Sequence, residues 1–147
     1  GSLGDVMKES AQAALSYIRS NTQIFGLAPD FFHGHDIHIH VPAGAIPKDG
    51  PSAGLTLAMA LLSLLKGKPC RRDTAMTGEL TLSGRILPVS GIREKLLAAK
   101  IAGIKTVIIP LKNQAELPTL SETLIKGIRI VTAGELIEIM DIVLKDS

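Results

Sequence analysis

The sequence has 147 residues, of which 46% are hydrophobic, and this length and content are typical of one domain with its own core. Aromatic residues make up only 3%, and 16 basic and 14 acidic residues leave a net charge of +2, which gives no basic or aromatic surface for nucleic acid. The longest apolar run, 55–65, is too short for the roughly 20 residues of a bilayer span, and no secretory leader opens the chain. We therefore expect a soluble domain without nucleic-acid or membrane partners. Its single cysteine, Cys70, excludes an internal disulfide and fits a reducing compartment.

The first half of the chain alternates helical and extended patterns. Apolar residues from Val6 to Ile18 recur at helical spacing and predict a helix over about 5–24. A period of two over 36–41 predicts a strand with His38 and His40 on one face. Residues 53–65 are apolar on all sides and predict a buried helix.

The second half predicts a hairpin followed by further helices and strands. The expected elements are strands over 74–82 and 85–89 joined by a turn at 83–84, a helix over 91–102, a strand over 106–109, a short helical piece over 112–116, a strand over 128–131 and a last helix over 133–144. This mixture predicts an α+β fold, with a mixed sheet, a β-hairpin and packed helices.

Ser52 opens the predicted buried helix within the run Gly50-Pro51-Ser52-Ala53-Gly54, which fits the G-x-S-x-G pattern of nucleophilic serines. The small neighbours let a substrate backbone approach, and the helix start offers free N–H groups for an oxyanion. A serine at this position is also a common helix N-cap, and the pattern alone leaves both interpretations open. All four histidines precede Ser52, so the histidine that normally follows such a serine is absent.

Lys95 is the candidate base. Projection of the 91–102 helix at about 100° per residue places this lysine between Ala99 and Ala102 on an apolar arc. Desolvation and the positive end of the helix dipole both lower a lysine pKa and favour the neutral amine, which can accept a proton from Ser52. An ammonium that reaches water along the helix edge is equally compatible with the pattern.

Four segments together carry a family resemblance. The chain resembles the C-terminal proteolytic domain of Lon, an ATP-dependent protease family, in the segments 38–42, 47–54, 74–80 and 91–99. The resemblance implies the ribosomal protein S5 domain 2-like fold and a serine endopeptidase in which Ser52 is the nucleophile and Lys95 the base. It also implies that Thr77 orients the lysine; without it, Thr77 reads as a strand residue chosen for packing.

The resemblance gives further roles to the loop before the helix. Asp49 matches an aspartate beside the nucleophile, where it organises the loop or holds Lys95 charged and inactive; a simple turn hydrogen bond is the alternative. Backbone N–H groups around Ser52 are expected to hold the oxyanion, in a loop that Gly50, Pro51 and Ala53 help to shape.

The same resemblance implies a larger assembly. Lon-like enzymes are ring hexamers whose AAA+ module unfolds misfolded and regulatory proteins and feeds them to this domain. No phosphate-binding loop occurs in the sequence, so we expect ATP and Mg²⁺ to bind a module outside residues 1–147, and no cofactor or metal within them. We also expect the first strands of the family domain to be missing, an extended apolar substrate beside Thr77, and the bacterial cytoplasm as location, with the mitochondrial matrix as the alternative.

Two other functions remain as alternatives. A non-catalytic Lon-like oligomerisation or peptide-binding module requires neither Ser52 nor Lys95. A metallohydrolase would use His38 and His40, although no cysteine or carboxylate stands at a spacing that completes a metal site.

Overall fold

A computed structural model describes residues 4–41 and 50–145 of the chain. The helices are α1 (Asp5–Ser20), α2 (Gly54–Lys66), α3 (Ile92–Ile101), α4 (Glu122–Ile125) and α5 (Met140–Val143), with 3-10 helices η1 (Phe31–His33), η2 (Leu111–Thr119) and η3 (Leu136–Ile139). The strands are β1 (Thr74–Met76), β2 (Glu79–Leu80), β3 (Ile86–Leu87), β4 (Thr106–Pro110) and β5 (Arg129–Ala133).

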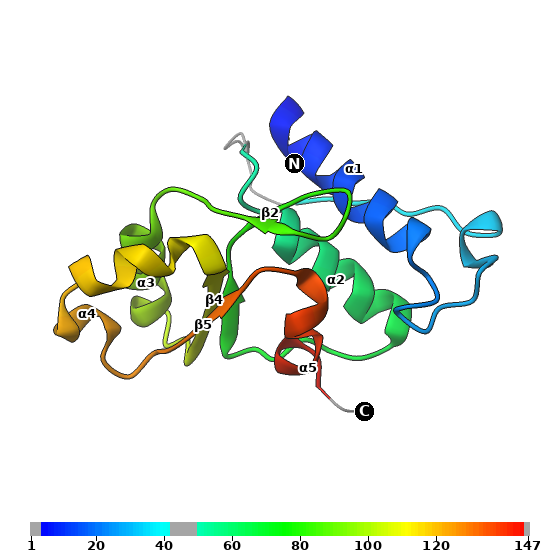
Figure 1. Cartoon of the computed structure of the whole chain (residues 1–147). Coiled ribbons are helices and arrows are strands. Elements are labelled where there is room, and N and C mark those ends of the chain that lie inside the picture. The colour runs from blue at the N-terminus through cyan, green and yellow to red at the C-terminus, as the bar shows by residue number, and fades with distance from the viewer. Residues whose placement is uncertain (1–3, 42–49, 146–147) are drawn as a thin grey trace.

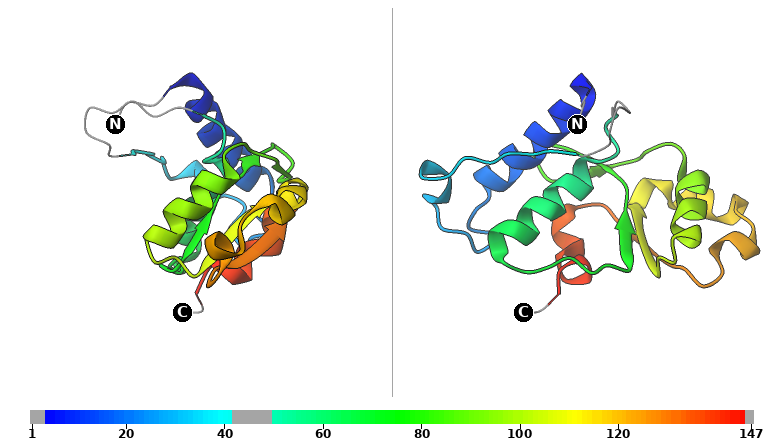
Figure 2. Two further views of the ribbon diagram at one scale, coloured as in Figure 1. Left: turned by 90° about the vertical axis from the view of Figure 1, so that its left-hand side faces the viewer. Right: turned by 180° about the vertical axis from the view of Figure 1, so that it is seen from behind.

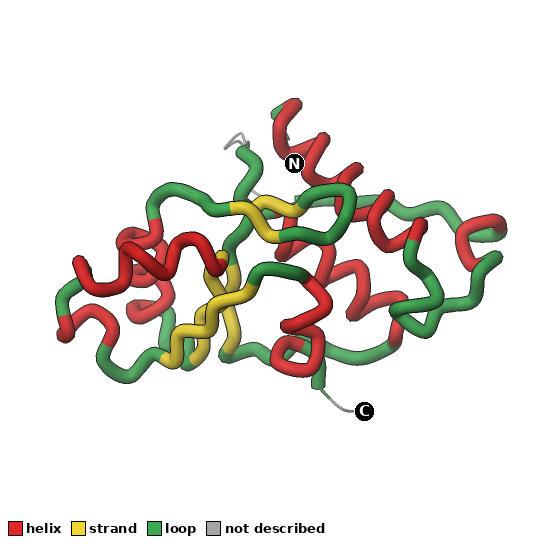
Figure 3. The backbone as a smooth tube through the Cα atoms, viewed as in Figure 1, coloured by secondary structure: helices red, strands yellow, loops and turns green. Residues whose placement is uncertain are grey.

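A parallel sheet in the order β1-β4-β5 lies at the centre of the described chain (Figure 3). The middle strand, β4, is apolar along most of its length, as expected for a strand with both faces covered. Val107 and Ile109 belong to a smaller core with α3, whereas Ile108 belongs to the larger core with α2. The two faces of β4 therefore join two separate cores.

Helices cover both faces of this sheet. In Figure 1, α3 and α4 lie on one side of the strands and α2 and α5 on the other, and the view from behind in Figure 2 shows the same arrangement. None of the helices in the described ranges is long and apolar enough to cross a membrane.

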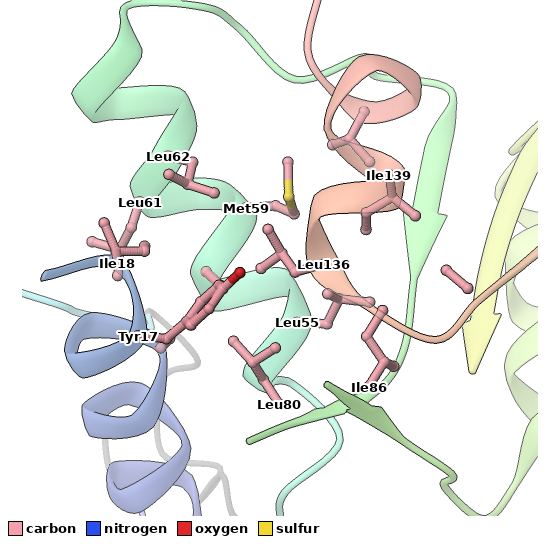
Figure 4. Close-up of a cluster of buried hydrophobic side chains, with 14 of the residues drawn as sticks. Tyr17, Ile18, Leu55, Met59, Leu61, Leu62, Leu80, Ile86, Leu136 and Ile139 are labelled. Carbon is pink, nitrogen blue, oxygen red and sulfur yellow. The ribbon is translucent and has the colours of Figure 1, made fainter. Parts of the chain in front are cut away.

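The larger core is formed mainly by α1 and α2. Figure 4 shows Ile18 of α1 beside Leu61 and Leu62 of α2, and the ring of Tyr17 near Leu80. These side chains are at most 6% exposed. The start of α2, which carries the candidate serine at its edge, is thus held by a well-packed helix pair.

The predicted strand over 36–41 is wrong. These residues form no regular secondary structure, although Ile37 and Ile39 do pack against the larger core. The rings of His38 and His40 stack at 6.4 Å between centroids, so the two side chains do lie on one side. The alternation therefore reflects which side chains are buried, without strand pairing within the described ranges.

The predicted strand over 74–82 is also wrong as a single element. The chain leaves the parallel sheet after β1 and enters the separate antiparallel hairpin of β2 and β3. At the corner between them, Thr77 N–H donates to Ile108 O at 3.1 Å and Gly78 N–H donates to Ser52 O at 3.0 Å. Tertiary hydrogen bonds thus redirect the backbone, and the described strands form two sheets in place of one mixed sheet.

The remaining predictions agree with the structure apart from their boundaries. The first helix ends at Ser20, before the predicted 24, and the last helical segment begins at Leu136, because residues 129–133 extend β5. The short helices η1 and α4 were not predicted. The α+β class is confirmed.

Candidate active site

Ser52 lies immediately before α2 and is half-buried. The N-cap position of this helix is Ala53, whose side chain cannot accept a capping hydrogen bond. Within the described ranges, the Ser52 hydroxyl makes no hydrogen bond, while the Ser52 carbonyl accepts from Gly78 N–H. The backbone of this serine is therefore fixed and its hydroxyl is not used as a helix cap.

Lys95 lies in the second turn of α3 and is half-buried. Its Nζ donates to Thr77 Oγ1 at 3.2 Å and to the carbonyl oxygen of Ser90 at 3.0 Å. Burial lowers the pKa of the Lys95 amine below its ordinary value. Two acceptors thus direct the amine, while desolvation favours its neutral form.

Of the two acceptors of the Lys95 amine, Thr77 provides a hydroxyl from a buried residue. Its residue is 6% exposed, and its backbone N–H is bonded to Ile108 of β4. Thr77 stands at the corner between β1 and β2, where strand packing alone would not require a hydroxyl. The structure thus brings Thr77 into contact with Lys95, and the orienting role implied by the resemblance stays a prediction.

One cavity of about 480 Å³ brings these residues together. It is lined by Ser52, Ala53, Thr56, Ala75, Met76, Thr77, Lys95, Ala98, Ala99, Ala102, Ile104 and Val107. Lys95 is the only charged residue that borders it within the described ranges, and alanines form much of the remaining wall. No hydrogen bond joins Ser52 Oγ to Lys95 Nζ in this part of the chain, and such bonds are often long in unliganded enzymes.

Two backbone donors stand at the serine edge of the cavity. In the described structure, the N–H groups of Ser52 and Ala53 donate to no protein acceptor, whereas the next two N–H groups bond to Pro51 O and Gly78 O. Donors at a helix start are suited to an oxygen that gains negative charge. Gly50, with φ +120°, supplies the left-handed conformation that brings the loop into α2.

The sequence also singled out Asp49, His38 and His40 as candidate site residues. Asp49 lies outside the described residues, so its predicted role stays a prediction. His38 and His40 line a different cavity, beside Leu57 and Leu61. The described residues contain no group of three metal-ligating side chains, and the half-buried Cys70 thiol donates weakly to Met59 O at 3.9 Å.

Sequence reasoning missed two features of the site. The carbonyl of Ser90 holds Lys95, but a backbone acceptor carries no residue-type signal. The corner at Gly78 binds Ser52, and only its glycine, inside an otherwise strand-like run, pointed to a close backbone approach.

One apolar cavity thus brings together a serine hydroxyl, a partly desolvated lysine amine and N–H donors at a helix start. These are the kinds of group that a peptidase requires, and here they stand on an α+β scaffold. The family model of the Lon protease (S16) C-terminal proteolytic domain matches residues 1–146. The chain belongs to this family, and the resemblance seen in its four segments is confirmed.

Curated relatives support the same assignment. The chain is 55% identical over 145 residues to Lon protease of Geobacter metallireducens, covering 99% of this chain and 18% of that protein. It is 55% identical over 147 residues to Lon protease of Heliobacterium modesticaldum, covering 100% and 18% respectively. Lon protease 1 of Bacillus subtilis is 51% identical over 141 residues, covering 96% and 18%. The chain thus spans less than a fifth of the length of these relatives.

Proposed function

We propose that this chain is the proteolytic domain of an ATP-dependent serine endopeptidase, in which Ser52 and Lys95 form the catalytic dyad. One observation carries the proposal: a partly desolvated lysine amine, held by Thr77 Oγ1 and Ser90 O, borders the same cavity as a serine whose hydroxyl makes no hydrogen bond to any described residue. A neutral amine beside a serine hydroxyl is a known way to activate that nucleophile.

The proposed reaction has two stages. Neutral Lys95 takes the Ser52 proton as Oγ attacks the peptide carbonyl carbon, and the N–H groups of Ser52 and Ala53 stabilise the resulting oxyanion. The Lys95 ammonium then gives its proton to the departing amine as the C–N bond breaks. Water, deprotonated by Lys95, hydrolyses the acyl-enzyme and restores the serine hydroxyl.

The shape and chemistry of the cavity favour an unfolded polypeptide as substrate. Its alanine-rich wall accepts an apolar side chain, and the segment around Thr77 offers backbone beside which an extended chain can lie. Misfolded and regulatory proteins are the substrates we propose, as part of protein quality control in the bacterial cytoplasm.

The proposed full-length protein is a homo-hexamer. ATP and Mg²⁺ would act in a module outside this sequence, and the domain itself would need neither a cofactor nor a metal. The relatives, of which this chain covers 18%, leave room for such a module. Asp49, three residues before Ser52 in the sequence, would organise the loop or hold Lys95 in its charged, inactive form.

Hydrolysis of an unstructured protein such as casein tests this proposal. Ser52→Ala and Lys95→Met are each expected to lower the rate by at least about 100-fold, because the dyad works as a unit. Lys112→Met, which replaces an exposed lysine, serves as the control. Equal rates for all four proteins would contradict the protease assignment and favour a non-catalytic peptide-binding module; inhibition of the wild type by a chelator would favour a metallohydrolase.

A further inference from the structure

We propose that Asn113 is a positioning residue for Lys95, acting through the backbone of Val89 and Ser90. This inference rests on the proposed role of Lys95 as the base. Asn113 belongs to η2, which contributes no residue to the lining of the cavity among the described residues.

The side-chain amide of Asn113 forms two hydrogen bonds with the backbone of Val89, one through its oxygen and one through its nitrogen; we call this pair of bonds the Asn113 grip. Val89 N–H donates to Asn113 Oδ1 at 3.0 Å, and Asn113 Nδ2 donates to Val89 O at 2.9 Å. Asn113 is 4% exposed, and its Nδ2 also donates to Glu116. A buried amide with this pairing acts as a short length of strand that fixes the position of one residue.

The segment over 88–90 makes few backbone hydrogen bonds in the described structure. It joins β3 to α3, and within the described ranges the backbone of 88–90 makes hydrogen bonds only with Asn113 and with the Lys95 amine. Pro88 has no N–H to donate, and Gly91 turns the chain into the helix with φ +76°. The side chain of Val89 also packs against the smaller core, and together with this packing the hydrogen bonds of Asn113 fix the backbone next to the Ser90 carbonyl.

That carbonyl is one of two acceptors that hold the Lys95 amine. Thr77 Oγ1 comes from the strand side of the cavity and Ser90 O from the loop before α3, so the two acceptors direct Nζ from different elements. If the Ser90 carbonyl moves away, Thr77 Oγ1 is the one remaining acceptor of the two, and the amine is no longer held in a fixed direction toward the cavity. Misplacement of a reacting group by about 1 Å can cost about 100-fold in rate.

The same carbonyl influences the charge of the amine. A carbonyl oxygen favours the ammonium form, whereas burial favours the neutral amine. Lys95 is the only charged residue lining the cavity among the described residues, and Glu116 lies behind Asn113. Loss of the Asn113 grip is therefore expected to lower the pKa of Lys95 further while making the amine less well placed.

The test compares Asn113→Ala with Leu117→Ala. Leu117 lies on the same 3-10 helix and packs against the smaller core, so its truncation loosens η2 without removing the grip on Val89. Four quantities are measured for each variant: the melting temperature, kcat and KM for casein-derived peptides, and the pKa of Lys95 from the 13Cε chemical shift of labelled lysine.

Asn113→Ala is expected to lower kcat by about 10- to 100-fold with little change in KM and to move the Lys95 pKa downward. Leu117→Ala should lower the melting temperature without moving that pKa. Asn113→Gln keeps an amide with the same donor and acceptor but displaces it by one methylene. An intermediate effect is therefore expected, and no charge is placed beside Glu116, so a folded variant is retained if the alanine protein does not fold. An unchanged pKa and kcat in folded Asn113 variants would overturn the inference.

The chemical-shift measurement also separates this inference from the proposed function. If Ser52→Ala keeps full activity, the protease assignment fails, but the pKa of Lys95 still shows whether Asn113 positions the amine. If Ser52→Ala is inactive and the Asn113 variants match the wild type, only the positioning role fails.

Discussion

The backbone N–H of Gly78 donates to the carbonyl oxygen of Ser52 across 3.0 Å. Its neighbour, Thr77, accepts from Lys95 Nζ, so two consecutive residues hold the candidate nucleophile and the candidate base. Gly78 O also accepts from Leu55 N–H in the first turn of α2. One corner of the chain thus contacts both the serine and the lysine.

A side chain at this corner is expected to disturb both fold and site. A Cβ on Gly78 would lie 2.7 Å from Ile86 Cγ2 and 3.3 Å from Leu55 Cδ2. Gly78→Ala should therefore lower the free energy of unfolding by about 1–3 kcal/mol and reduce proteolysis. Urea denaturation measures the first effect, with Gly34→Ala as the matched control, since a Cβ there meets no atom within 4 Å. Equal stability of the two variants would show that the corner can open.

Loss of the Thr77 hydroxyl tests the orientation of the lysine. Thr77→Val keeps the shape but removes one of the two acceptors of Lys95 Nζ, so kcat should fall by about 10- to 100-fold with KM nearly unchanged. Thr77→Ser retains the oxygen and should restore much of the rate. Steady-state kinetics on a fluorogenic peptide would contradict this role if valine and serine had the same effect.

The rate of hydrolysis should depend on pH through Lys95. Its neutral form is the proposed base, and burial lowers its pKa, so kcat/KM should rise with pH to a plateau whose midpoint lies below the ordinary lysine value of about 10.4. A pH–rate profile measures this midpoint. A rate independent of pH from 5 to about 10 would argue against lysine as the base.

Stability should depend on pH in the same direction. Between the lowered folded pKa and about 10.4, the unfolded chain binds more protons at Lys95, so stability rises with pH across this window. Below it the charged amine remains partly desolvated, and Lys95→Met should raise the melting temperature at pH 7. This gain should shrink as the pH passes through the window, and a gain that stays constant up to pH 10.5 would contradict it. Lys112→Met controls for the loss of one exposed charge.

The alanine wall of the cavity is expected to determine which side chain is accepted. Ala102, the C-cap residue of α3, borders the cavity, and Ala102→Leu would fill part of the roughly 480 Å³. Peptides with leucine or methionine before the cleaved bond should then lose kcat/KM by about 10-fold or more relative to peptides with alanine. Mass spectrometry of the products measures this preference. A proportionate loss for all peptides would indicate damage to the dyad instead.

Sequence patterns located the long helices and singled out Ser52 and Lys95 as candidates because these signals are local. The start of α2 follows a run of small residues, and the arc of α3 that carries Lys95 is readable from helical spacing. The break after β1 is not local, since it depends on Ile108 and Ser52 as hydrogen-bond partners of the corner. The grip of Asn113 on Val89 is equally non-local, because it joins residues separated by a helix and a strand.

The segment over 36–41, which forms no regular secondary structure, shows a different limit of sequence reasoning. Ile37 and Ile39 alternate with histidines because alternate side chains face the core, and an extended chain has this period whether or not it pairs. The period of the apolar residues therefore indicates which side chains are buried. It does not indicate whether the backbone pairs with a neighbouring strand.

The two faces of β4 have a consequence for the nascent chain. Ser52 is attached to the core that contains Ile108, and Lys95 to the core that contains Val107 and Ile109, so the hydroxyl and the amine belong to separately packed halves. Neither core by itself positions both groups. The proposed hydrolysis therefore requires both cores to be packed against β4, and a chain in which only one core has formed is expected to be inactive.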